Sequence, residues 1–189
     1  MKRLIFLLIL LCLFLSSSLL WAAGTPPRPG ELFPDLSLPI PKNPKEKAYL
    51  GLTGDGSFTL VQVKTQVVII EIFSMYCPYC QKEAPLINEL YRAIEEDPGL
   101  KGKIKVLGIG VGNSSFEVGI FKKNYSIPFP LFADEDLIFH QTLGGVRTPY
   151  FVAVKLDKDK TIRVIFSELG SIHKAKPFLQ KITKLAELQ

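Results

Sequence analysis

Residues 74–85 read SMYCPYCQKEAP and contain two cysteines, Cys77 and Cys80, with two residues between them. The preceding residues, 67–73, are β-branched and apolar almost throughout, which is typical of a central strand covered on both faces. After Cys77, apolar residues recur at three- and four-residue intervals until the DPG of residues 97–99, which predicts a helix. The stretch therefore predicts a buried strand that leads through Cys77 into the first turn of a helix.

This position has chemical consequences for the two thiols. The Cys77 sulfur would face the unpaired N–H groups and the positive dipole end of the helix. Both favour the thiolate, which is the form that attacks disulfides. Cys80, one turn later, is expected to be more buried and to resolve the mixed disulfide. Pro78 fits the first helical turn, whereas Pro85 lies inside the helix and is expected to kink it.

The start of the chain has the pattern of a targeting signal. Lys2 and Arg3 precede an apolar run, residues 4–15, that has the length of the apolar core of a signal peptide. The uncharged stretch continues to residue 23 and reaches the roughly 20 residues that span a bilayer. Residues 1–24 are therefore predicted to be either a cleaved signal peptide or an N-terminal membrane anchor. Both predict an exported, periplasmic or extracytoplasmic protein, held at the cytoplasmic membrane in the second case.

The cysteine count supports a redox role. The chain has three cysteines, and Cys12 lies in the apolar leader, so the exported part holds only Cys77 and Cys80. A structural disulfide framework would need more cysteines, and this pair would close too small a loop to add much stability. A zinc site needs four ligands, whereas His140 and His173 stand alone in separate segments. We expect a pair that cycles between dithiol and disulfide, with no metal and no cofactor.

The charge pattern argues against nucleic acid as a partner. Without Lys2 and Arg3, the chain has 21 basic and 18 acidic residues, a net charge of +3. This small excess is spread through runs of mixed sign, which is typical of solvated surface. The 165 residues after residue 24 suffice for one domain with a sizeable core.

Strands and helices are predicted to alternate along these residues. Residues 25–47 are rich in proline and charge, and predict a tether followed by an extended arm with little helix. The predicted strands are residues 57–63, 67–73, 103–111, 129–132, 150–156 and 161–166. The predicted helices after the one that begins near Cys77 are residues 115–125, 135–143 and 174–188. This order predicts an α/β sandwich.

The chain resembles the thioredoxin superfamily, and within it the exported, often membrane-anchored, TlpA/ResA-like thiol-disulfide oxidoreductases. The resemblance covers roughly residues 31–188, and its most specific part is C-x-x-C-x-x-E-x-P, present as Cys77, Cys80, Glu83 and Pro85. It implies a thioredoxin-like domain over residues 48–189. Such a domain is a three-layer α/β sandwich in which a central mixed sheet has helices on both faces.

Two shorter segments add to the resemblance, and two features depart from it. FPDLSLP at 33–39 resembles the arm that opens many such domains, and VRTPYFVAV at 146–154 resembles their cis-proline loop. The loop maps the cis-proline to Pro149, but it is about one residue shorter than usual, with Arg147 where glycine is common. The dipeptide Pro78-Tyr79 is more similar to that of glutaredoxins.

The resemblance implies an enzyme that exchanges disulfides with protein substrates and forms a Cys77–Cys80 disulfide during turnover. The reductive direction is favoured, with cytochrome c maturation among the pathways and a membrane-embedded or periplasmic protein as electron donor. An alternative from another class is a metal-binding or metallochaperone module that uses the same two thiols.

Two acids are expected to assist the thiols. Glu71 interrupts an apolar strand, and burying a carboxylate is costly. Thioredoxins carry a buried acid at this position, so Glu71 is expected beneath Cys80, with a raised pKa, as its proton acceptor. The alternative is that Glu71 turns outward or is neutralised by a lysine. Glu83 is expected to raise the thiol pKa values through its charge, unless it is a solvated surface residue.

The remaining candidates concern substrate binding. Tyr76 and Tyr79 flank the thiols and are expected to form a docking lip together with Pro78, although core packing would explain Tyr76 equally well. Pro149 is expected to be cis, in a loop that lies against the Cys77 sulfur. The backbone of Thr148 would then be free to pair with an extended substrate segment.

Overall fold

The computed structural model describes residues 25–188. The predicted signal peptide or anchor, residues 1–24, lies outside these residues, as does residue 189. Within the described part, no helix has both the length and the apolar character needed to cross a membrane.

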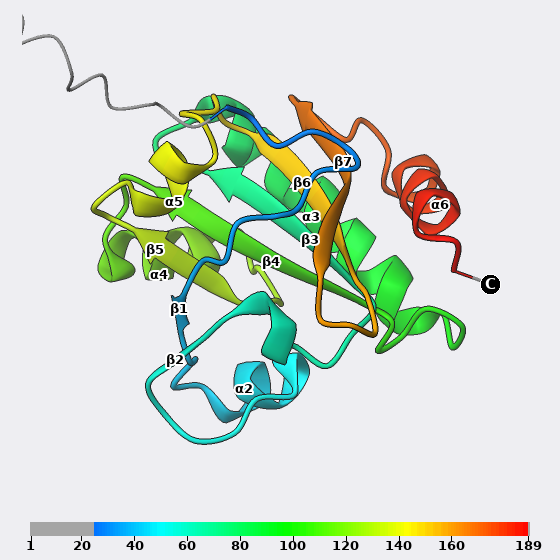
Figure 1. Cartoon of the computed structure of the whole chain (residues 1–189). Helices are drawn as coiled ribbons and strands as arrows, with labels where there is room; N and C mark the ends of the chain where they lie inside the picture. The colour runs from blue at the N-terminus through cyan, green and yellow to red at the C-terminus, as the bar shows by residue number, and fades with distance from the viewer. Residues whose placement is uncertain (1–24, 189) are drawn as a thin grey trace, which may run out of the picture.

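A five-stranded mixed sheet forms the centre of the molecule, in the order β5-β4-β3-β6-β7 (Figure 1). The three strands β3, β4 and β5 are parallel, β6 is antiparallel to β3, and β7 is antiparallel to β6. Their bounds are β3 Val67–Phe73, β4 Ile104–Val111, β5 Leu131–Asp134, β6 Tyr150–Leu156 and β7 Ile162–Leu169.

Helices and the N-terminal arm cover the two faces of this sheet. One face packs against α3 (Pro78–Glu96), α4 (Ser115–Asn124) and α6 (Ala175–Ala186). The other packs against the arm, α5 (Ile138–Thr142) and the last residue of α2 (Pro44–Leu50). In Figure 1 the arm, drawn in blue, crosses the sheet on the side opposite α3. The predicted three-layer α/β sandwich with a mixed sheet is confirmed.

The central strand β3 shows why both faces need a cover. All seven of its residues are buried. Ile69 and Phe73 point into the core beneath α3, whereas Ile70 and Ile72 point into the core beneath the arm. Because side chains alternate along a strand, Glu71 shares the face of Ile69 and Phe73. It therefore lies on the side of the sheet that carries the cysteine helix.

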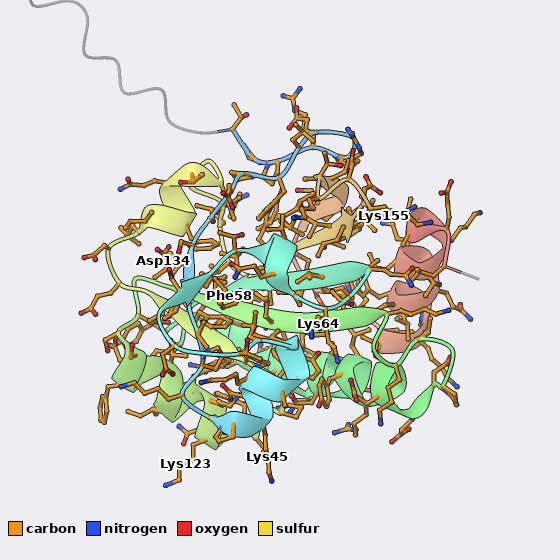
Figure 2. The ribbon with its side chains drawn as sticks, turned by 60° about the horizontal axis from the view of Figure 1, so that its bottom comes forward. Lys45, Phe58, Lys64, Lys123, Asp134 and Lys155 are labelled. Atoms are coloured by element: carbon orange, nitrogen blue, oxygen red, sulfur yellow. The ribbon has the colours of Figure 1, made fainter. Side chains whose placement is uncertain are left out.

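One prediction about the first part of the chain is wrong. Residues 57–63 do not form one strand: β2 is only Ser57–Phe58, pairs with β1 (Leu38–Pro39) outside the central sheet, and precedes a 3₁₀ turn, Leu60–Gln62. A capping box between Thr59 and Gln62 starts this turn. Phe58, labelled in Figure 2, is buried against Phe132 nonetheless.

The arm contains little helix, and the helix α2, which the sequence did not single out, begins near its end at Pro44. The Asn43 side chain accepts the Lys45 N–H at 2.9 Å, and the missing N–H of Pro44 costs nothing in the first helical turn. Earlier in the arm, the N–H of Gly30 donates to the Val164 carbonyl at 2.8 Å, and the Val164 N–H donates to Glu31. The arm thereby covers part of the edge strand β7, which would otherwise expose unpaired backbone groups.

Candidate active site

Cys77 lies where β3 gives way to α3, as the sequence predicted. It is the N-cap residue of α3, with Pro78 in the first turn. Its Sγ accepts a hydrogen bond from the Cys80 N–H at 3.4 Å. Cys77 is half-buried, whereas Cys80 is fully buried, and both carry free thiols. The structure thus describes the dithiol form, with one sulfur accessible and the other enclosed.

Two side chains that the sequence did not single out hold the loop before Cys77. The Met75 N–H donates to Oδ1 of Asn113 at 2.8 Å, and the Met75 carbonyl accepts from Nε2 of Gln81 at 2.9 Å. Asn113 is fully buried and directly follows the turn after β4. The only signal in the sequence was a polar residue at the carboxyl end of a parallel strand, where sites of α/β proteins gather.

The loop before β6 lies against the attacking sulfur. The Thr148–Pro149 peptide bond is cis, as predicted. The Cys77 Sγ lies 3.4 Å from the Thr148 carbonyl oxygen, so the predicted contact between loop and sulfur is present. His140 holds the start of this loop, because its Nε2 lies 3.0 Å from the Val146 carbonyl oxygen.

The two thiols have opposite pKa shifts. For Cys77, partial burial is the largest influence and raises the pKa, but hydrogen bonds from the Thr148 side chain and from Cys80 outweigh it. The pKa of Cys77 is therefore lowered. The Thr148 carbonyl acts the other way, because it accepts the thiol proton. Burial raises the pKa of Cys80 far above its usual range, and the charge of Glu71 adds to this. Cys77 is thus the thiol that ionises first.

Glu71 lies on β3, 2% exposed, on the face that packs against α3. Its pKa is raised to about 8, mainly by burial, and the charges of Glu83 and Cys77 contribute to the shift. No group within residues 25–188 hydrogen-bonds its Oε1. The alternative of an outward-turned Glu71 is wrong. Its charge raises the pKa of Cys80, and its place beneath Cys80 and its role as proton acceptor stay predictions.

Glu83 is also buried, with 2% of its surface exposed, so the alternative of a solvated surface residue is wrong. Its Oε1 accepts the Ile172 N–H at 2.8 Å and thereby ties α3 to the segment before α6. Helix α3 continues past Pro85 to Glu96 as one helix. Burial is the main cause of the raised pKa of Glu71, and the charge of Glu83 raises this pKa further.

The two tyrosines beside the thiols are both exposed, Tyr76 by 66% and Tyr79 by 70%. Core packing is therefore the wrong explanation for Tyr76. Its hydroxyl donates to Oε1 of Glu117, near the start of α4. The Tyr79 ring has the ammonium group of Lys82 at 5.9 Å from its centroid. Both rings are available to a partner that approaches the thiols.

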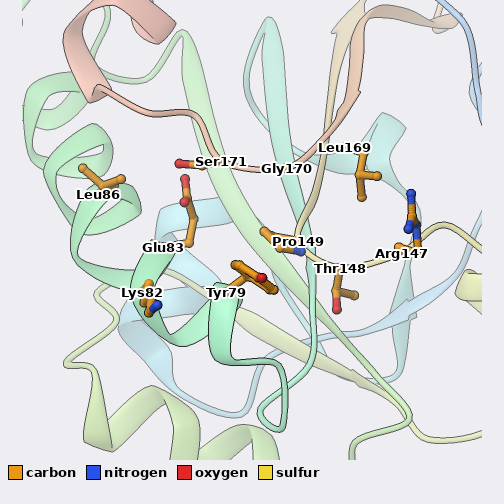
Figure 3. Close-up of a pocket in the computed structure, with 10 residues that line it drawn as sticks. All are labelled: Tyr79, Lys82, Glu83, Leu86, Arg147, Thr148, Pro149, Leu169, Gly170 and Ser171. Carbon is orange, nitrogen blue, oxygen red and sulfur yellow. The ribbon is translucent and has the colours of Figure 1, made fainter.

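A groove of about 530 Å³ opens beside Pro149 (Figure 3). Three segments form its walls: the first turns of α3, the loop before β6, and the turn that follows β7. Its lining residues are Tyr79, Lys82, Glu83, Leu86, Arg147, Thr148, Pro149, Leu169, Gly170 and Ser171. The predicted substrate-binding residues Tyr79, Thr148 and Pro149 meet in this groove. No pattern in the sequence pointed to the wall formed by residues 169–171.

The arrangement suits thiol chemistry. Within residues 25–188, no group of three His, Cys, Asp or Glu side chains is placed to hold a metal ion. An accessible sulfur with a lowered pKa, a buried second sulfur and a buried carboxyl instead form one continuous set. Such a set can attack a disulfide, resolve the product and take up the proton released.

Fold and site define a thioredoxin-like protein with a redox dithiol. Residues 29–166 match the AhpC/TSA family, and the chain belongs to this family. Its curated relatives include thiol-disulfide oxidoreductase ResA from a strain of Bacillus cereus, which is 28% identical over 127 residues, 66% of this chain and 68% of the relative. ResA from Bacillus thuringiensis subsp. konkukian is 29% identical over 66% of this chain and 68% of its own length. The resemblance to ResA-like oxidoreductases is confirmed.

Solved structures show the same fold. A secreted thiol-disulfide isomerase from Corynebacterium glutamicum matches with a TM-score of 0.58 and 21% identity, over 83% of this chain and 86% of the other. StoA from Bacillus subtilis matches with a TM-score of 0.52 and 18% identity, over 68% of this chain and 90% of the other. The predicted class, a thiol-disulfide oxidoreductase of thioredoxin-like fold, agrees with these relatives.

Proposed function

We propose that this protein is exported and reduces disulfides in protein substrates through Cys77 and Cys80. One observation carries the proposal. The accessible Cys77 sulfur has a lowered pKa and touches the Thr148 carbonyl at the groove, while Cys80 is enclosed behind it. This asymmetry suits Cys77 to attack the substrate and Cys80 to resolve the mixed disulfide.

In the first step, the Cys77 thiolate attacks one sulfur of a substrate disulfide. A bond forms between Cys77 Sγ and that sulfur, the substrate S–S bond breaks, and the second substrate sulfur leaves as a thiolate that takes up a proton. The groove beside Pro149 would hold the substrate segment, with the Thr148 backbone and the Tyr79 ring as contacts. Pro78 and the exposed Tyr76 ring, which do not line the groove, would contact the substrate next to it.

In the second step, Cys80 attacks Cys77 Sγ and releases the first substrate sulfur as a thiolate. The Cys77–Cys80 disulfide forms, and the two electrons of the dithiol have passed to the substrate. Because burial raises the pKa of Cys80 so strongly, its proton needs an acceptor within the protein. Glu71 takes this proton in its carboxylate form, since a base with a pKa near 8 is well matched to neutral conditions.

The charge of Glu71 supports the reductive direction. Negative charge on Glu71 disfavours a second negative charge on Cys80. The reduced pair therefore gains little stability from ionisation at Cys80, which favours loss of its electrons to a substrate. A membrane-embedded or periplasmic electron donor would return the pair to the dithiol, and cytochrome c maturation is one pathway that needs such a reductant.

Trapping of mixed disulfides tests which cysteine attacks the substrate and which resolves the mixed disulfide. Cys80→Ser should accumulate covalent complexes with substrate proteins, because nothing resolves them, whereas the matched variant Cys77→Ser should accumulate few. Non-reducing gels with mass spectrometry of the trapped peptide identify the bonded cysteine. Equal trapping by the two variants, or trapping mainly through Cys80, would contradict the assignment.

A redox titration of the pair against glutathione tests the direction. We expect a potential below that of the extracytoplasmic compartment, at which the dithiol gives up its electrons. A potential above it would make the protein an oxidant. Export is tested separately, by fractionation of cells and by the N-terminal sequence of the mature protein, which also separates a cleaved leader from an anchor at residues 1–24.

A further inference from the structure

The groove beside Pro149 carries two exposed cations that can meet a partner. Lys82 comes from α3 and Arg147 from the loop before β6, and both side chains are exposed. None of the ion pairs within residues 25–188 involves either of them. In Figure 3 they lie on opposite sides of Tyr79 and Pro149. Positive charge is thus placed at two sides of the same groove.

The groove also has apolar lining. It is formed by Leu86, Pro149 and Leu169, of which Leu169 is 48% exposed. Among the described residues, Glu83 is the only acid of the lining, and its Oε1 already accepts the Ile172 N–H. Its charge disfavours a substrate carboxylate beside it, whereas Lys82 and Arg147 favour one beside them. The groove is therefore complementary to a segment that carries both an apolar side chain and carboxylates.

The groove lies next to the reacting sulfur. Thr148 lines it, and the Thr148 carbonyl oxygen lies 3.4 Å from Cys77 Sγ. A segment bound in the groove therefore lies beside Cys77. We infer that the protein selects acidic substrate segments that carry an apolar residue beside the attacked cysteine. This rests on the proposed function and adds to it the class of substrate, with Lys82 and Arg147 as the residues that determine specificity.

Peptide capture by the Cys80→Ser protein tests the inference. Two peptides, Glu-Ala-Cys-Leu-Glu and Lys-Ala-Cys-Leu-Lys, carry the cysteine as a mixed disulfide with uncharged 2-mercaptoethanol. The rate of capture on Cys77 is followed by mass spectrometry. At low salt the acidic peptide should react about fivefold faster, the size expected for two exposed charge contacts. The ratio should approach one at high salt, where such contacts are screened. A third peptide with Ser in place of Leu should react several times more slowly than the acidic one.

Charge reversal locates the effect. Adding Lys82→Glu and Arg147→Glu to the Cys80→Ser protein should turn the preference toward the basic peptide. Adding Lys123→Glu is the matched control, because this exposed lysine lies in the last turn of α4, outside the groove, and the ratio should stay as in the parent.

Two results would overturn the inference, and they are distinct. Equal rates for the acidic and basic peptides, or a preference that survives charge reversal, would refute the substrate class and leave the role of Cys77 intact. Failure of Cys77 to react with any peptide and with bis(2-hydroxyethyl) disulfide would refute the proposed function, and the inference with it.

Discussion

Replacing Glu71 by glutamine should stabilise the protein at alkaline pH, and more so as the pH rises. Glu71 is buried on β3, and burial raises its pKa from 4.5 to about 8. A carboxyl whose pKa is raised on folding binds its proton more tightly in the native state than in the unfolded one. The contribution of Glu71 to the free energy of unfolding is therefore fully present below pH 4.5 and is lost as the pH rises toward 8.

The size of this loss follows from the two pKa values. Each pKa step corresponds to about 1.4 kcal/mol, so a rise from 4.5 to about 8 corresponds to at most about 5 kcal/mol above pH 8. About 3 kcal/mol of that is lost by pH 7 on the same basis. Glutamine has nearly the same shape but no charge to desolvate, so the stability of Glu71→Gln lacks this dependence.

Urea unfolding of the reduced protein at pH 5, 6, 7 and 8, at constant ionic strength, measures the effect. The free energy of unfolding of Glu71→Gln minus that of the wild type should increase by about 3.5 kcal/mol from pH 5 to pH 8. Glu89→Gln, an exposed position on α3, is the control for effects of the buffer and should leave the difference from wild type constant. A difference for Glu71→Gln that does not change with pH would refute the buried, protonated carboxyl.

Three further predictions concern other parts of the site and the core. Alkylation of the reduced protein with iodoacetamide should modify Cys77 first, while Cys80 stays protected. The pH at which the alkylation rate of Cys77 is half-maximal should lie below that of an ordinary thiol. Modification of both cysteines at the same rate would contradict the opposite pKa shifts. Asn113→Ala leaves the Met75 N–H without its partner and should cost about 1–3 kcal/mol in urea unfolding; a change below about 0.5 kcal/mol would mean that water replaces the amide. Phe58→Ala should lower the free energy of unfolding by about 3–5 kcal/mol, because the Phe58 ring is buried against Phe132. A decrease below about 1 kcal/mol would show that β2 adds little to the core.

The cysteine stretch could be predicted well because its signals are local. A continuous apolar strand, a cysteine at the helix start and proline in the first helical turn all act within a few residues. The same kind of local pattern gave a wrong prediction of one strand over residues 57–63. Their β-branched residues predicted one strand, but the reciprocal bonds of Thr59 and Gln62 turn the chain after Phe58. Strand propensity describes a fit to a half-buried surface, and here the chain has only the short β1 to pair with.

The groove could not be predicted in full because its walls are far apart in sequence. Glu83 and Ile172 are 89 residues apart, yet their hydrogen bond decides whether Glu83 is solvated or buried. The wall formed by residues 169–171 reaches the site because β7 returns antiparallel to β6 and ends beside Pro149. The Gly170 N–H donates to the Pro149 carbonyl at 2.9 Å and fixes this approach. Such a contact depends on register within the sheet, which periodicity does not reveal.

The placement of the two sulfurs explains how one short motif can serve two steps. Cys77 lies on the groove side, where the Thr148 side chain and the Cys80 N–H stabilise its thiolate. Cys80 lies on the sheet side, where burial and the charge of Glu71 keep it protonated. Attack on a substrate therefore needs no proton transfer within the core, whereas resolution needs one. Glu71 is the only carboxyl on β3, and it is buried.

Loss of this carboxyl should leave the first step fast and slow the second by about 10²–10⁴-fold at neutral pH, the usual size of general-base assistance. Since the carboxylate is the active form, the rate of resolution in the wild type should rise with pH up to about 8 and then level off. A resolution rate in Glu71→Gln equal to that of wild type across this range, measured by stopped-flow reduction of a model disulfide, would leave Glu71 without a part in the chemistry.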